Sequence, residues 1–161
     1  MPYKQKVSTC LWFNKEAEDA AKFYVSLFDN SRITAVSRYG RDMPMPEGTV
    51  LTVLFELAGT EFMALNGGPH FTFSEASSIV VQCDTQAEID RLWDALLAGG
   101  GREQQCGWLK DRYGLPWQIV PARLRDMMQD KDRARTDRVM AAVMTMVKLD
   151  IAKLEAAYKG A

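Results

Sequence analysis

Two segments of this chain carry the same order of residue types, and this internal repeat limits the possible folds more than any single residue does. The second segment follows the first at a constant distance of 70 residues. The matched pairs are Asn14 with Asp84, Ala17 with Ala87, Glu18 with Glu88, Phe23 with Trp93, and Leu27 with Leu97. The β-rich stretches around these pairs match as well, which favours a duplication over chance similarity between two amphipathic helices. Each half leaves one apolar sheet face uncovered, so the two halves are expected to pack on each other.

The first half is predicted to form a strand, a helix and three further strands. Apolar residues recur with helical spacing over 15–28, and Asn14 is a favourable N-cap for that helix. The sequence Ala58-Gly59-Thr60 is typical of a tight turn between two strands. The predicted strands are Val7 to Phe13, Ile33 to Tyr39, Thr49 to Leu57, and Glu61 to Leu65.

The second half repeats this order. Asp84 is the predicted N-cap of its helix, and Gly99-Gly100-Gly101 ends that helix. Gly114 takes the role of Gly59 in the turn before the last strand. The predicted strands are Ser77 to Cys83, Glu103 to Lys110 as one or two short strands, and Leu115 to Val120.

The last quarter of the chain departs from the repeat. Apolar residues at helical spacing predict one helix from about 137 to 158, preceded by a short helix over 121–129. The long helix either closes the core of its own domain or lies across a partner subunit, and the sequence leaves both alternatives open.

Composition excludes several classes of function. The 161 residues suit one domain or two half-domains with a common core. A net charge of −1 and alternating charges over 123–138 give no nucleic-acid surface. The chain has no apolar run of about 18 residues for a membrane span, and Met1 to Thr9 lacks the apolar core of a signal peptide. Three cysteines without C-x-x-C spacing suggest free thiols in a reducing cytoplasm.

Several sequence phrases resemble one known family. They are Trp12-Phe13 with Ala17 to Tyr24, Phe62 to Pro69, Asp84 to Asp90, Cys106 to Asp111, Gly114 to Pro121, and Arg138 to Ile151. With these phrases the chain resembles the vicinal oxygen chelate superfamily, which includes glyoxalase I, extradiol dioxygenases and fosfomycin-resistance proteins. Within it the chain is similar to the PhnB-like branch, often labelled 3-demethylubiquinone-9 3-methyltransferase.

The resemblance implies an α+β fold with two βαβββ modules that form a curved mixed, mostly antiparallel sheet, with C-terminal helices. The expected organisation is a paired glyoxalase-like domain over 1–121, with modules at about 6–66 and 77–121, and a helical extension over 122–161. Members of the superfamily often pair modules across subunits, so a homodimer is expected.

The resemblance also implies where a metal would bind. Superfamily enzymes hold a divalent metal with His, Glu or Gln from the first and last strands of each module. The matching positions here are Ser8, Met63, Ser78 and Gln118. Two hydroxyls, a thioether and an amide are poor ligands for a hard divalent ion. His70 lies in a loop and would be a single ligand. We therefore expect no catalytic metal and no other cofactor.

Aromatic and amide side chains near these positions suggest a small-molecule pocket. The candidate pocket residues are Ser8, Trp12, Met63, Asn66, Ser78, Trp108, Trp117 and Gln118. Trp117 is equally compatible with a core position. The charged triplet Lys110-Asp111-Arg112 is predicted to be a solvated turn rather than an acid–base site.

Cysteine chemistry is not favoured, because His70 is the only imidazole available as a base. Cys10 and Cys83 lie in predicted strands, where small core residues are expected, and Cys106 is predicted to be the least buried of the three.

The expected function is a PhnB-like protein that binds a small molecule in the cup of the sheet without a catalytic metal. Two alternatives remain open, a metal-dependent lyase or dioxygenase of the same superfamily and a methyltransferase as the family label implies. Rossmann-type methyltransferases bind their cofactor at a glycine-rich turn after the first strand. The corresponding link here, Phe13-Asn14-Lys15, has no glycine, which argues against methyl transfer. Whether the protein is an enzyme stays open.

Overall fold

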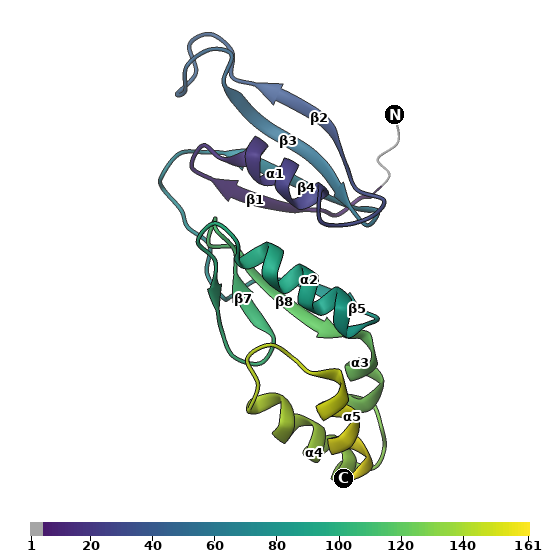
Figure 1. Ribbon diagram of the computed structural model, residues 1–161. Coiled ribbons are helices and arrows are strands. Elements are labelled where there is room, and N and C mark those ends of the chain that lie inside the picture. Colours follow the sequence, from purple (N-terminus) through teal and green to yellow (C-terminus); the bar gives the residue numbers. More distant parts are fainter. Residues whose placement is uncertain (1–4) are drawn as a thin grey trace. The chain divides into compact units, whose positions relative to one another are not determined.

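A computed structural model describes residues 5–161 of the chain. The chain divides into two compact units, one ending at Thr72 and the other spanning Phe73–Ala161. Each unit contains a four-stranded sheet with a helix across one face (Figure 1). The predicted α+β fold with two βαβββ modules is confirmed.

The first unit follows the predicted order of elements. They are β1 (Thr9–Phe13), α1 (Ala17–Val25), β2 (Arg32–Arg38), β3 (Val50–Leu57) and β4 (Thr60–Asn66). The sheet order is β1-β4-β3-β2, with β1 parallel to β4 and the other pairs antiparallel. Alternate strand residues, including Phe13, Phe55 and Ala64, are buried on the side of α1, which contributes Ala20 and Tyr24 to this core.

The second unit begins with the same order. Its elements are β5 (Ile79–Cys83), α2 (Gln86–Leu97), β6 (Arg102–Glu103), β7 (Trp108–Lys110) and β8 (Pro116–Pro121). The sheet order β5-β8-β7-β6 reproduces that of the first unit strand for strand. Ile89, Leu92 and Trp93 of α2 are buried, as are Leu109 and Trp117 of the sheet beneath it.

The repeat extends to the hydrogen-bonding register. Cys10 pairs with Met63 between the parallel strands of the first unit, and Val80 pairs with Gln118 at the equivalent position of the second. Gly59 and Gly114 both have a φ of +83°, a left-handed conformation that favours glycine. The internal repeat predicted from sequence is thus confirmed in strand order and in register.

Both predicted N-caps are wrong. The N-cap of α1 is Glu16, which makes no side-chain capping bond, and the Oδ1 atom of Asn66 instead accepts the Ala17 N–H at 2.9 Å. The N-cap of α2 is Thr85, whose hydroxyl accepts the Glu88 N–H at 3.1 Å. The Glu88 carboxylate accepts the Asp84 N–H at 2.9 Å. This reciprocal pair resembles a capping box, which satisfies two backbone donors with one Thr-x-x-Glu spacing.

The predicted single helix over 137–158 is also wrong. The chain forms α3 (Ala122–Met128), α4 (Arg133–Met144) and α5 (Ile151–Lys159). Asp150 caps α5 by accepting the Lys153 N–H at 3.1 Å. Between α4 and α5, the carbonyls of Met146 and Val147 accept N–H bonds from the β6–β7 hairpin at 2.8 and 2.7 Å. These tertiary hydrogen bonds take the place of helical ones and interrupt the helix.

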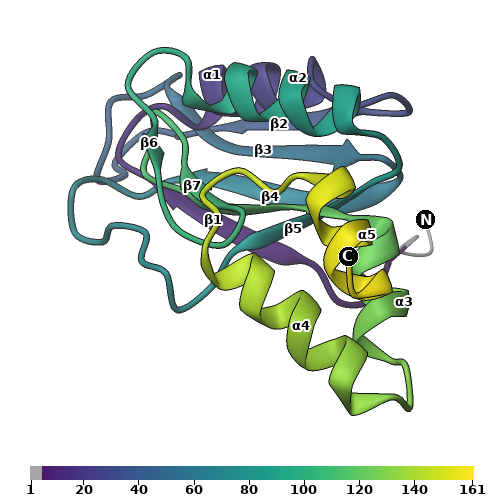
Figure 2. The ribbon, with the colours of Figure 1, turned by 60° about the horizontal axis from the view of Figure 1, so that its bottom comes forward.

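The three C-terminal helices share a core with the β6–β7 turn of their own unit (Figures 1 and 2). The buried members are Met127, Val139, Val143, Leu149 and Leu154, and Cys106 and Val120 pack against them. The first of the two sequence-based alternatives, packing on the chain's own core, is therefore observed. Among residues 5–161, none of the helices has the length and apolarity that a membrane span needs.

Candidate functional site

The sheet face turned away from α2 carries three of the expected site residues in the second unit. The register places Val80 and Trp108 on either side of Gln118. The Gln118 Nε2 atom donates a hydrogen bond to Ser78 Oγ at 2.9 Å. Ser78, Trp108 and Gln118 are half-buried, and Val80 is 49% exposed. We call Ser78, Trp108 and Gln118 the open-face cluster.

An ion pair borders the open-face cluster. Lys110 lies two residues after Trp108 in β7, and its Nζ atom is 2.7 Å from Glu75 Oε1. Gln104 Nε2 donates to the same oxygen at 2.8 Å. The hydrogen bonds from Lys110 and Gln104 lower the pKa of Glu75 from 4.5 to about 2. This carboxylate is therefore ionised and already engaged at neutral pH.

In the first unit, Trp12 and Met63 lie on the sheet face turned away from α1. The Trp12 Nε1–H donates to the carbonyl of Gly68 at 2.9 Å, and the Phe71 ring packs edge-on against the indole with centroids 4.9 Å apart. Gly67 lies directly against the indole, where a Cβ atom would be 2.1 Å from the ring. Ser8 is exposed and precedes β1.

Two of the expected site residues lie on the opposite, helix-covered faces. Asn66 is 6% exposed, and its amide accepts the Ala17 N–H and donates to Val50 O at 3.1 Å. Trp117 is completely buried, and its Nε1–H donates to Asp111 Oδ2 at 2.9 Å. The hydrogen bond between Ala17 and Asn66 links the start of α1 to β4. Trp117 belongs to the core beneath α2.

The prediction of a solvated turn at Asp111 is wrong. This residue is 2% exposed, and its Oδ1 atom accepts the N–H groups of Tyr113 at 2.8 Å and Leu115 at 3.1 Å. Together with the bond from Trp117, these contacts make Asp111 the residue that orders the turn before β8. Aspartate side chains in turns often accept a hydrogen bond from the backbone N–H two residues further along the chain, as Asp111 does from Tyr113. The charged neighbours Lys110 and Arg112 made a solvated turn the favoured interpretation of the sequence.

The cysteine prediction is wrong in part. Cys10 is exposed and Cys106 is half-buried, whereas Cys106 was expected to be the least buried. The alternation of β1 turns Cys10 away from α1, on the same sheet face as Trp12. Cys83 is buried as expected, and its burial, with Glu88 and Asp84 nearby, raises the pKa of the thiol to about 12.

The four positions that the resemblance assigns to a superfamily metal, Ser8, Met63, Ser78 and Gln118, carry side chains that do not suit a hard divalent ion. Ser78 and Gln118 are hydrogen-bonded to each other, and a hydroxyl with an amide offers no anionic donor. Met63 offers a thioether, which is a soft ligand. The described residues contain no group of three or more His, Cys, Asp and Glu side chains placed to share an ion. The donor set at these positions therefore does not fit the superfamily metal.

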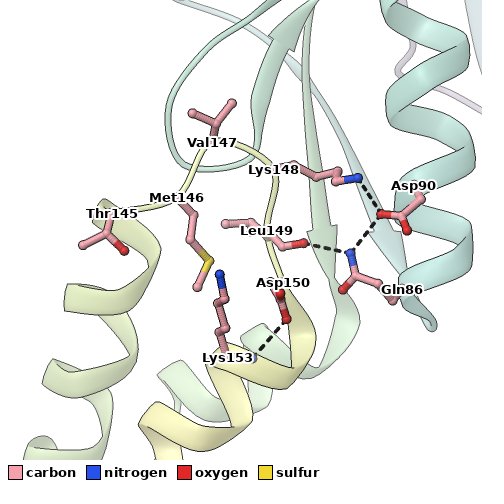
Figure 3. A pocket seen from close by; sticks show the side chains of 9 residues that line it. All are labelled: Gln86, Asp90, Thr145, Met146, Val147, Lys148, Leu149, Asp150 and Lys153. Carbon is pink, nitrogen blue, oxygen red and sulfur yellow. Dashed lines mark hydrogen bonds and ion pairs between the residues drawn. The ribbon is translucent and has the colours of Figure 1, made fainter.

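A pocket of about 530 Å³ lies elsewhere in the second unit, between α2 and the link from α4 to α5 (Figure 3). Gln86 bridges the two parts, since its Nε2 atom donates to Leu149 O at 3.1 Å and its Oε1 atom accepts the Ile151 N–H at 2.9 Å. Lys148 pairs with Asp90 at 2.8 Å, which lowers the pKa of the carboxyl and raises that of the ammonium. This pocket is not evident from the sequence, because its two sides are far apart in the chain.

The fold and its sheet order define a class of protein. One solved structure that is similar to this chain is that of protein PA1353 from Pseudomonas aeruginosa. Its sequence is 23% identical, and the TM-score is 0.59 over 73% of this chain and 98% of that one. The fosfomycin resistance protein FosX from Listeria monocytogenes, crystallised with Mn(II) and sulfate, is 15% identical at a TM-score of 0.51, over 73% of this chain and 91% of that one. At these identities the two matches show a shared fold.

Two stronger matches identify the family within that class. A PhnB protein from Bacillus cereus is 40% identical, with a TM-score of 0.66 over 72% of this chain and 99% of that one. The family model for 3-demethylubiquinone-9 3-methyltransferase matches residues 5–120. The chain belongs to this PhnB-like family. Helices α3 to α5 lie beyond the matched residues, and a comparison with curated proteins gave no match.

Proposed function

We propose that this protein binds a small molecule at the open-face cluster and does so without a catalytic metal. The observation that carries the proposal is the hydrogen bond between Gln118 and Ser78 beside the half-buried ring of Trp108. A few convergent polar groups next to an aromatic wall are typical of small-molecule sites.

The donors of the cluster indicate what kind of ligand it suits. Ser78 Oγ accepts a bond from Gln118 and can donate its own hydroxyl hydrogen, while Gln118 Oε1 can accept a further bond. Trp108 supplies an apolar ring surface. The cluster therefore suits a neutral or weakly polar molecule that has an oxygen or nitrogen at one end and an apolar body.

A ligand screen by thermal shift tests this proposal. Small neutral aromatic compounds with one polar end are expected to include ligands that raise the melting temperature, with oxyanions and with Mg²⁺, Mn²⁺, Zn²⁺ and Ni²⁺ giving no comparable shift. Gln118→Ala should abolish the shift from a ligand, whereas Gln105→Ala, at an exposed glutamine of the β6–β7 turn, should retain it. A large stabilisation by one divalent metal that is lost in Gln118→Ala would instead support a metal-dependent lyase or dioxygenase.

The family description does not by itself extend methyl transfer to this chain. The link between β1 and α1 contains no glycine, and the first N–H of α1, that of Ala17, donates to Asn66 Oδ1. This turn therefore lacks the features of a Rossmann cofactor site. Calorimetric titration with S-adenosylmethionine is expected to give no binding heat. Saturable heat at one equivalent would favour the methyltransferase alternative.

We propose further that the protein is a homodimer in a reducing, cytoplasmic compartment. The superfamily resemblance supports dimerisation, and the three free cysteines are compatible with reducing conditions. Light scattering should then give about twice the chain mass of 18.1 kDa. A mass equal to that of one chain at micromolar concentration would contradict the dimer.

A further inference from the structure

Two sulfur atoms meet in the second unit, where the turn between β6 and β7 contacts the end of α4. Cys106 Sγ donates a hydrogen bond to Met144 Sδ at a separation of 3.7 Å. Met140 lies one helical turn before Met144 in α4, and side chains four residues apart share a helix face. We call Cys106, Met140 and Met144 the sulfur cluster.

Two features of the backbone fix the position of the Cys106 thiol, namely the conformation of the β6–β7 turn and a hydrogen bond to the residues after α4. Cys106 and Gly107 occupy the centre of the β6–β7 turn with φ angles of 63° and 83°. The Cys106 N–H donates to Met146 O at 2.8 Å, which ties the turn to the residues that directly follow α4. This hydrogen bond therefore keeps the Cys106 thiol close to the C-terminal end of α4.

The residue types in the cluster are unusual for their positions. A turn with two successive left-handed residues favours Asn or Gly first, and a side chain such as cysteine adopts this conformation at a cost. Met140 and Met144 are 44% and 64% exposed, while Val139 and Val143 of the same helix are buried in the core. The two methionines are thus not needed for the packing of α4.

We propose that the sulfur cluster is a binding site for a soft monovalent cation, Cu(I). Thiolate and thioether sulfurs select Cu(I) over hard ions such as Mg²⁺ or Mn²⁺. Binding replaces the proton of the Cys106 thiol, which passes to the solvent, and the resulting thiolate neutralises the single positive charge of the ion while the two thioethers add neutral ligands. At the metal–sulfur distance of about 2.3 Å typical of thiolate sites, the 3.7 Å separation of Cys106 and Met144 gives a sulfur–metal–sulfur angle of about 107°. This angle is close to that of a tetrahedral site, so the two sulfurs need little movement to share an ion.

The surroundings favour the same ion. Cys106 packs against the apolar core of the C-terminal helices, which leaves one side of the thiol shielded from water. Met140 and Met144 are flexible side chains on the solvent side and can close over a bound ion. The site has no residue in common with the open-face cluster, so either proposal can fail without the other.

Anaerobic titration of the reduced full-length protein with Cu(I), in competition with the chromophoric chelator bicinchoninate, tests the proposal. The wild type is expected to withdraw one equivalent of Cu(I) per chain. Cys106→Ser should weaken binding by more than the roughly 10–100-fold cost of losing an outer partner of a metal ligand. Met144→Leu should weaken it less, because a thioether contributes no charge. X-ray absorption at the copper edge should show only sulfur neighbours.

Two matched variants serve as controls. Cys10→Ser removes the exposed thiol of the first unit, and Met43→Leu removes a methionine that is 44% exposed. Both should bind Cu(I) as the wild type does. The proposal is overturned by wild-type protein that cannot compete with the chelator, by unchanged binding in Cys106→Ser, or by loss of binding in Cys10→Ser. If Cys106→Ser does not fold, as judged by circular dichroism, the double variant Met140→Leu/Met144→Leu decides, and unchanged affinity in it overturns the site.

Discussion

In the first module β2 and β3 have seven and eight residues, whereas their counterparts β6 and β7 in the second module have two and three. The second module compensates with helices that follow β8. Carbonyls of Met146 and Val147 accept the N–H groups of Cys106 and Gly107 at the end of the shortened hairpin. The hairpin of module two therefore relies on hydrogen bonds to residues outside the repeat.

The hairpin before the last strand differs as well. In module one Leu57 pairs with Thr60 across a two-residue turn. In module two the last pair is Lys110 with Pro116, and the longer turn is organised by the buried carboxylate of Asp111. The shared register shows that the duplication preserves strand pairing, while turns and open-face residues diverge. At equivalent positions of the open faces the side chains differ in type, as with the thioether of Met63 and the amide of Gln118.

The largest expected effect follows from the longer turn. Asp111→Ala leaves two backbone N–H groups and the Trp117 indole N–H without their acceptor in a buried place. The expected loss in the free energy of unfolding is about 2–4 kcal/mol, because buried donors without partners are costly. Urea denaturation measures this change.

An aspartate in the first module provides the control for this substitution. Asp29→Ala, at an exposed loop position, should change the stability by less than about 0.5 kcal/mol. Equal effects of the two substitutions would show that the Asp111 contacts do not order the turn.

The next effect concerns a close approach in the first module. Gly67→Ala would place a Cβ atom 2.1 Å from the Trp12 ring, and the expected cost is about 1–3 kcal/mol of stability. Gly40→Ala is the control, because its nearest neighbour, Met43 Sδ, would be at an ordinary 3.7 Å. Thermal unfolding followed by tryptophan fluorescence reports both the stability and the environment of Trp12. Wild-type stability in Gly67→Ala would mean that the indole does not occupy this place in solution.

A third prediction tests whether Ser78 and Gln118, on the open sheet face of the second module, occupy the positions of superfamily metal ligands. Because Ser78 and Gln118 are in direct contact, Ser78→His/Gln118→Glu places an imidazole and a carboxylate next to each other. We expect at least about tenfold tighter Zn²⁺ binding than in the wild type, equivalent to about 1.4 kcal/mol, by calorimetry. Gln105→Glu is the control, with a carboxylate added on the β6–β7 turn. No gain in the double variant would refute the assignment of these two positions to the superfamily metal site.

The succession of strands and helices along the chain could be predicted because it follows from a repeated pattern of apolar residues and from two glycines at equivalent turns, Gly59 and Gly114. The sheet architecture is implied by the family resemblance, and the order and register of the strands come from the structure. The family resemblance points to Ser78 and Gln118 as equivalent to metal ligands of one module, and the structure shows them in contact because β5 and β8 are neighbours. Sequence alternation further requires that adjacent residues such as Trp117 and Gln118 face opposite sides of a sheet, so only one of them can belong to an open-face site.

Other features depend on contacts that the local sequence does not contain. The helical spacing of apolar residues continues through 145–150, and only the distant N–H groups of Cys106 and Gly107 reveal the break between α4 and α5. Asp111 has charged neighbours on both sides, yet its partners Leu115 and Trp117 bury it. The pattern of apolar and charged residues along the chain therefore predicts the strands and helices of the two modules, but it does not predict contacts between segments that are distant in sequence.

The smallest expected effect is a dependence on pH that comes from the ion pair beside the open-face cluster of the second module. The pKa of Glu75 falls from 4.5 to about 2 through hydrogen bonds from Lys110 and Gln104. Because the folded pKa is below the ordinary value, the stabilisation is fully present above about pH 4.5 and is lost as the pH falls toward 2. Glu75→Gln should therefore be slightly less stable than the wild type at pH 6, and the two should converge as the pH approaches 2. The carboxylate is exposed, so salt should reduce the difference as well.

Acid titration followed by carboxyl carbon NMR measures this pKa directly, and urea denaturation at several pH values measures its effect on stability. Lys110→Met removes the main partner and should return the pKa of Glu75 toward 4.5, although the bond from Gln104 retains part of the shift. Glu47→Gln, at an exposed glutamate of the first module, is the control for loss of one surface carboxylate. A Glu75 pKa near 4.5 in the wild type would show that the ion pair beside the open-face cluster does not persist in solution. In that case Lys110 would be free to bind an anionic ligand at the cluster, and the oxyanions of the ligand screen would become the compounds to test first.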